Sequence, residues 1–136
     1  MRAAASLIRI SNYQVEVLQK RLAEITERRA NAEVALAILQ AEGEAETAHA
    51  EENASAGWYL IGYRQGLKIR MDAAQALIDQ CVAEESGARD ALTEAYEALK
   101  KYEQVEANAK AKAAKLAAKL ETAALDELGL RRKAAK

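Results

Sequence analysis

The sequence predicts an all-α protein, namely a two-helix antiparallel coiled-coil hairpin with a longer, overhanging second helix. Three observations predict this fold. From residue 60 to residue 130, residues at alternating steps of four and three form a series of 21 positions, of which only four are charged. A shorter series of the same kind runs from residue 8 to residue 39, and a glycine-containing segment separates the two. A repeat of about 3.5 residues keeps one stripe of a helix facing one partner helix, so the two series predict a coiled coil.

The first helix is expected over about residues 6–51. Its series, which we call its seam, contains Ser11 and Arg29 as its only polar members and fades at Gly43 and Glu46. The N-terminus is kept within this helix, because Ile8 and Val15 already belong to the seam. Arg9 also interrupts any apolar run long enough for a signal peptide. The seam positions are Ile8, Ser11, Val15, Leu18, Leu22, Ile25, Arg29, Ala32, Leu36 and Leu39.

A turn is expected at about residues 53–61. Asn53 and Ser55 are residues that cap helices, and Gly57 accepts the left-handed conformation with which helices often end. The aromatic residues of this segment are expected to pad the turn. The segment Gly-Trp-Tyr-Leu-Ile-Gly-Tyr is not a phosphate-binding loop, because it lacks the Gly-Lys-Ser/Thr ending and a flanking strand.

The second helix is expected over about residues 60–131, followed by a basic C-terminal tail, within a single hairpin of residues 1–136. Its four charged seam positions lie 21 residues apart, and we find no physical reason for that spacing. The seam positions are Leu60, Arg64, Leu67, Met71, Ala74, Ile78, Cys81, Glu85, Ala88, Leu92, Ala95, Leu99, Tyr102, Glu106, Ala109, Ala113, Leu116, Leu120, Ala123, Glu127 and Leu130.

If the chain folds back near residue 56, position i lies opposite position 112 − i, and residues beyond about 108 have no partner within the chain. The apolar stripe nevertheless continues there, through Ala109, Ala113, Leu116, Leu120 and Ala123. An unpaired apolar stripe on a protruding helix predicts a binding surface for another protein.

Composition and charge agree with an exposed helical protein. Pro and Phe are absent, and 33 of the 136 residues are alanine, a strong helix former that builds only a small core. Residues 42–56 hold five glutamates without Lys or Arg, whereas residues 110–136 carry eight basic and three acidic residues. The basic end is explained by a solvated helix C-terminus or, alternatively, by steering towards an acidic ring or pore. The charges alone slightly favour the first explanation.

Catalytic, metal and cofactor sites are not expected. One histidine, His49, and one cysteine, Cys81, cannot form a metal cluster or a nucleophile–base pair. Cys81 is expected to be buried in the seam, and His49 to be solvated. Glu84 and Glu85 are expected to be ordinary surface charge, with Glu85 a defect in the seam. The longest uncharged run is too short to span a membrane, and a lone seam cysteine suits a reducing cytoplasm.

Three segments of the chain resemble the FliJ family, the small coiled-coil component of the bacterial flagellar type III export apparatus. They are Leu7-Ile-Arg-Ile-Ser-Asn-Tyr13, the stretch from Trp58 through Tyr63-Arg-Gln, and Lys101-Tyr-Glu followed by Leu125-Asp-Glu127 and Arg131-Arg-Lys. The resemblance covers nearly the whole chain. Gly62 and Gly66 depart from the polar or bulky residues usual in the family.

The resemblance implies a stalk-like, non-enzymatic hairpin in the cytoplasm, peripherally associated with the membrane export apparatus and monomeric in isolation. Its implied partners are the hexameric export ATPase, the membrane protein of the export gate and the export chaperones. The basic end would enter the ATPase ring and the turn would face the gate. The residues implied for the gate are Tyr59, Tyr63 and Leu67. Those implied for the ring are Ala109, Ala113, Leu116, Leu120, Ala123, Leu125, Arg131, Arg132 and Lys133.

Two alternatives remain at this point. A general coiled-coil adaptor could use the overhanging stripe to pair with its own copy. A nucleic-acid arm is disfavoured, because the basic stretch has no interleaved aromatic residues and the rest of the chain is acidic. A neighbouring gene for an export ATPase would separate the export function from both.

Overall fold

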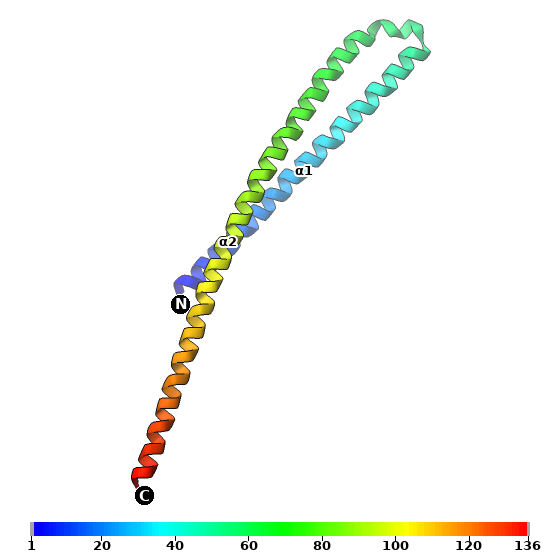
Figure 1. Ribbon diagram of the computed structural model, residues 1–136. Helices are drawn as coiled ribbons and strands as arrows, with labels where there is room; N and C mark the ends of the chain where they lie inside the picture. The colour runs from blue at the N-terminus through cyan, green and yellow to red at the C-terminus, as the bar shows by residue number, and fades with distance from the viewer. Residues whose placement is uncertain (1, 136) are drawn as a thin grey trace. The chain divides into compact units, whose positions relative to one another are not determined.

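The structure, a computed structural model, describes residues 2–135 as two long helices joined by a short 3₁₀ helix (Figure 1). Helix α1 spans Arg2–Glu52, the 3₁₀ helix η1 spans Ala54–Tyr59, and α2 spans Leu60–Ala135. These described residues contain no strand, and α2 has 76 residues against 51 in α1. The predicted all-α antiparallel hairpin with a longer second helix is confirmed.

Both helices extend further than the sequence indicated. Helix α1 begins at Arg2, four residues before its expected start, and α2 continues to Ala135. The basic residues from Arg131 to Lys133 therefore lie inside the last turns of α2 and not in a separate tail. Alanine at residues 3–5, 134 and 135 accounts for the extension, because it has the highest helix propensity. None of the helices in this described part is long and apolar enough to cross a membrane.

Residues 16–93 form one compact unit, in which α1 and α2 pack antiparallel. Contacts between the two helices join residues whose numbers add up to between 110 and 114, close to the expected 112, as in Gly43 with Leu67 and Arg28 with Glu84. Cys81 is completely buried at the centre of this seam. Further buried apolar residues, among those of the unit whose side chains are described, are Ile25, Ala32, Ala50, Leu67, Ile78 and Ala88.

The seam of α1 does not fade at Gly43, contrary to the sequence-based expectation. Gly43 and Glu46 are half-buried, and Ala50 is buried one step further on. Leu67 lies directly over Gly43, where a Cβ atom would collide with its Cδ2 methyl group. Because Gly43 has no side chain, the side chain of Leu67 packs into the space beside its backbone. The seam therefore continues past Gly43.

The turn is also built differently from the prediction. No glycine among the described residues has a positive φ, so no left-handed glycine ends α1. Asn53 takes an extended conformation instead, with φ −126° and ψ 95°, and its side chain makes no capping hydrogen bond to η1. Its Oδ1 accepts a hydrogen bond from Ser55 Oγ at 2.7 Å. One extended residue followed by the tight 3₁₀ helix is enough to reverse the chain.

Residues up to Val15 and residues from Glu94 onward form the second compact unit. Its buried side chains include Ala4, Ser11, Val15 and Leu99, and its half-buried ones include Tyr102 and Ala109. From residue 110 to residue 135 every side chain is exposed. We call residues 110–135 of α2 the overhang.

Candidate protein-interaction surfaces

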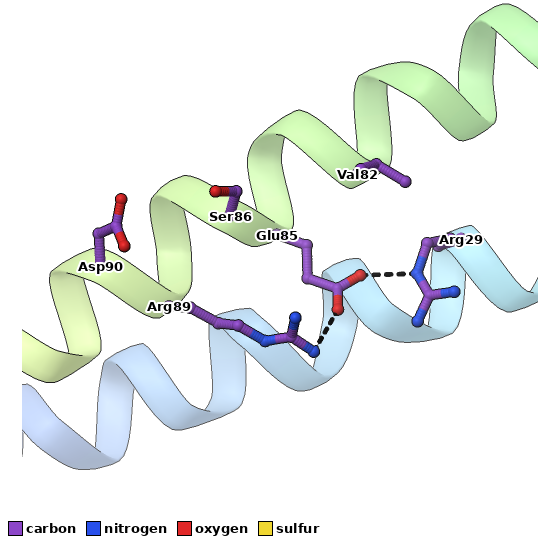
Figure 2. Close-up of a pocket in the computed structure, with 6 residues that line it drawn as sticks. All are labelled: Arg29, Val82, Glu85, Ser86, Arg89 and Asp90. Carbon is purple, nitrogen blue, oxygen red and sulfur yellow. Dashed lines mark hydrogen bonds and ion pairs between the residues drawn. The ribbon is translucent and has the colours of Figure 1, made fainter.

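Two charged seam residues, one from each helix, meet inside the hairpin. Arg29 Nε donates to Glu85 Oε2 at 2.6 Å, and Arg89 Nη2 approaches Glu85 Oε1 at 2.5 Å. Figure 2 shows the Glu85 carboxylate between the two guanidinium groups. The Glu85 side chain is only 6% exposed, so its charge is compensated where water has little access. Glu85 is therefore a paired seam residue and not the defect expected from the sequence.

A second ion pair lies beside the first. Arg28 pairs with Glu84, which also accepts a hydrogen bond from Gln80 at 3.3 Å. The hydrogen bond from Arg28, and then that from Gln80, hold the pKa of Glu84 below its ordinary value. Glu33 joins Arg29 at 2.9 Å, and the bonds to Glu85 and Glu33 raise the pKa of Arg29. The expectation that Glu85 is ordinary surface charge was wrong, because its side chain is buried, whereas the Glu84 side chain is 34% exposed.

A shallow groove surrounds these charges. It is lined by Arg29, Val82, Glu85, Ser86, Arg89 and Asp90. Both carboxylate oxygens of Glu85 are occupied by arginines, so this buried carboxylate is engaged as an ion-pair partner. Among residues 2–135, no three His, Cys, Asp or Glu side chains gather as metal ligands would. The local chemistry is that of helix pairing.

The turn presents an aromatic pair at the end of the hairpin. Tyr59 donates its hydroxyl proton to Glu46 Oε2 at 2.7 Å, which links η1 to α1. This hydrogen bond, followed by burial, raises the pKa of Tyr59. The Trp58 ring meets the Tyr59 ring edge-on, with centroids 6.0 Å apart and planes at 80°. Trp58 nevertheless remains 83% exposed, so it does not pad the turn as expected.

The three residues that the resemblance assigned to the gate differ in how far their side chains are exposed. Leu67 is buried over Gly43, whereas Tyr59 and Tyr63 are half-buried. Large apolar side chains that are described as exposed near the turn include Trp58 and Ile61, which sequence reasoning did not select. The exposure of Ile61 could have been anticipated from the sequence, because Ile61 follows the seam residue Leu60 directly and so lies outside the seam.

The overhang exposes the residues that the resemblance assigned to the ATPase ring, whereas Ala109 is half-buried just before it. Leu116 and Leu120, four residues apart on one helix face, are 59% and 63% exposed. Leu125, Leu128 and Leu130 are also exposed, of which Leu128 was not anticipated. The remaining residues of the assigned set, all exposed, are Ala113, Ala123, Arg131, Arg132 and Lys133.

Lysines run beside this apolar stripe. Lys112, Lys115 and Lys119 are spaced by three and four residues, which places them on one face of the helix next to Leu116 and Leu120. All three lysines are exposed. The overhang is thus a single helix with an exposed apolar stripe and a neighbouring basic face.

A paired, charge-matched seam between two long helices defines the class of the protein as a coiled-coil hairpin, with apolar side chains exposed at the turn and on the overhang. The chain is 60% identical, over 131 residues, to a protein named "Flagellar FliJ protein" from Caulobacter vibrioides strain NA1000 / CB15N, and equally to the protein of that name from strain ATCC 19089 / CIP 103742 / CB 15. The match covers 96% of this chain and 94% of each relative. The chain therefore belongs to the flagellar FliJ family, as its sequence resemblance predicted. No family model matches the chain, and no solved structure matches it significantly.

Proposed function

We propose that the chain is a non-enzymatic, stalk-like component of the flagellar type III export apparatus, and that its overhang binds the ring of the export ATPase. The observation that carries this proposal is the complete exposure of residues 110–135, which nonetheless continue the apolar seam. Leucines kept on a helix that packs against nothing in the chain serve a partner and not the fold. Because the chain belongs to the flagellar FliJ family, we look for that partner among the proteins of the flagellum.

The charge of the overhang supports the same partner. Its exposed lysines stand beside Leu116 and Leu120, so a partner must offer apolar contact and carboxylates along one wall. A single α-helix without a second helix alongside is about 10 Å wide, narrow enough for a central pore. Opposite charges would accelerate its entry and orient it.

The other end of the hairpin is proposed to face the membrane protein of the export gate, through the surface around Tyr59 and Tyr63. Leu67 would support this surface from below, because it is buried against Gly43. Export chaperones are proposed as further partners, and the protein would act in the cytoplasm at the membrane-bound apparatus. It would be a monomer until it meets the ATPase.

The test is the double substitution Leu116→Glu and Leu120→Glu. We expect circular dichroism to show unchanged helix content and melting temperature, because both leucines are exposed. Retention on immobilised ATPase hexamer should be lost, because two new charges would have to be desolvated in the contact. A suitable control is Val34→Glu with Ile38→Glu, a pair that is also exposed and four residues apart but lies on α1.

Intact ATPase binding by the Leu116→Glu, Leu120→Glu variant, with the control equally bound, would contradict the proposal. A loss of helix content in that variant would show that the overhang leucines belong to the fold. Pairing of the overhang with a second copy is the alternative function, since an exposed seam is suited to it. Sedimentation equilibrium of the chain alone would then show a dimer that the same substitutions dissociate.

A further inference from the structure

Trp58 is an exposed apolar side chain at the turn that the fold does not use. It is 83% exposed, and Ile61, three residues later, is 73% exposed. Trp58 lies in η1 and Ile61 in the first turn of α2, so two exposed apolar side chains stand three residues apart at the turn end of the hairpin. Tryptophan is the residue type most enriched among the anchors that dominate protein interfaces.

The Trp58 ring is also held in place. Its ring packs edge-on against Tyr59, and the Tyr59 hydroxyl is hydrogen-bonded to Glu46 of α1. A side chain that is ordered before binding loses less conformational entropy when a partner covers it. The hydrogen bond between Tyr59 and Glu46 therefore holds the ring against which Trp58 packs, and so orients Trp58 for contact with a partner.

The stretch of α1 that leads into the turn is acidic. Glu42, Glu44, Glu51 and Glu52 are exposed, and residues 42–56 contain no Lys or Arg. An anionic membrane surface would repel these carboxylates, so the exposed tryptophan does not fit a lipid anchor. A second copy of the chain offers a basic overhang, but a lone, fully exposed helix has no pocket to receive an indole.

We propose that Trp58 and Ile61, braced by the Glu46–Tyr59 hydrogen bond, insert into an apolar pocket with a basic rim on the cytoplasmic part of the export gate. This inference rests on the proposed function, because it specifies how the turn end would contact the gate. Trp58 is the anchor, Tyr59 is a positioning residue, and the four exposed glutamates match the basic rim.

The experiment measures binding of the purified cytoplasmic part of the gate to the full chain by calorimetry and by association kinetics at several salt concentrations. Trp58→Ala should weaken binding at least tenfold, and Ile61→Ala several-fold. The control Ile38→Ala removes an isoleucine that is 53% exposed but lies far along α1, and should leave the affinity unchanged. Tyr59→Phe should weaken binding several-fold and lower the fluorescence anisotropy of Trp58, the single tryptophan.

The charge contribution is tested separately. Changing Glu44, Glu51 and Glu52 to Gln should slow association several-fold and flatten its salt dependence. The matched control changes three exposed glutamates elsewhere on α1, Glu16, Glu24 and Glu27, and should leave the rate unchanged. A melting curve of each variant checks that the hairpin is intact.

The outcomes separate the two proposals. If the gate part binds the wild-type chain and Trp58→Ala binds equally well, the gate contact stands and the Trp58 anchor is refuted. If the wild-type chain does not bind the gate part, both are refuted. Binding to anionic vesicles that Trp58→Ala abolishes, or self-association that it abolishes, would identify a different occupant and overturn the inference.

Discussion

Arg29 and Glu85 are seam residues of opposite helices, and Arg29 Nε donates to Glu85 Oε2 across the seam at 2.6 Å. Arg29 is the only charged residue in the first seam series, and Glu85 is the most deeply buried charge of the second. A charge that has its partner at only one alignment of two helices penalises every other alignment. The pair therefore fixes the register in which α1 and α2 associate.

Removing one partner of this pair should be costly. Glu85→Ala removes the buried carboxylate that Arg29 and Arg89 share, while Arg29 keeps Glu33 and Arg89 is 64% exposed. We therefore expect a loss of about 1–2 kcal/mol in the free energy of unfolding. Glu127→Ala, which removes an ion-paired glutamate that is 67% exposed, should change it by less than about 0.5 kcal/mol. Chemical denaturation of the two variants measures both values, and equal losses would refute the buried role of Glu85.

Two glycine-to-alanine substitutions should differ in effect. Gly87 lies in α2 with open space around it, so Gly87→Ala should stabilise the helix by about 0.5–1 kcal/mol. Gly43→Ala places a methyl group against Leu67 and should be less stable than Gly87→Ala by about 1–2 kcal/mol. Melting temperatures decide the comparison. A Gly43→Ala protein that gains as much as Gly87→Ala would show that Leu67 does not fill the hole at Gly43.

The loss of stability caused by a Leu→Ala substitution should increase with the burial of the leucine side chain. Leu99 is 9% exposed and Leu22 is half-buried, so Leu99→Ala should cost about 3 kcal/mol and Leu22→Ala about 2 kcal/mol. Leu125→Ala, at a position 62% exposed, should cost less than about 0.5 kcal/mol. The same order should appear in thermal unfolding, and a costly Leu125→Ala would place the overhang inside a packed core.

The lowered pKa of Glu84 predicts a pH-dependent contribution to stability. The hydrogen bond from Arg28 favours the ionised carboxylate, so the contribution is complete above the ordinary pKa of a glutamate and is lost as the pH falls through the lowered value. Glu84→Gln should therefore melt below the wild type at about pH 7, and the difference should disappear at about pH 2. A difference that persists in acid would indicate packing and not charge.

The seam could be predicted from the sequence because a heptad pattern is local. Side chains at the predicted seam positions from Ile8 to Leu39 are all buried or half-buried, and on α2 this holds from Leu67 to Ala109. The Arg29–Glu85 pair could not be predicted. The expected alignment places Arg29 opposite residue 83, and only the actual packing reveals the two-residue offset that joins it to Glu85.

The turn was harder to predict for a different reason. Glycine and asparagine indicate where a chain reverses, but several backbone conformations accomplish the reversal, and the extended Asn53 was one of them. Exposure of Trp58, at 83%, depends on that conformation, because the backbone of the turn sets the direction of the indole. The apolar nature of the segment was therefore visible in the sequence, whereas its availability to a partner was not.

Photo-crosslinking from the overhang tests the central claim most directly. A photoreactive phenylalanine derivative replaces Leu120 in one protein and Val34 in another, both at exposed positions, 63% and 59%. Each protein is mixed with purified ATPase hexamer and irradiated. We predict a covalent product with the ATPase subunit from position 120 and none from position 34. The absence of a product from position 120, or equal products from both positions, would contradict the assignment of the overhang as the end that binds the ring.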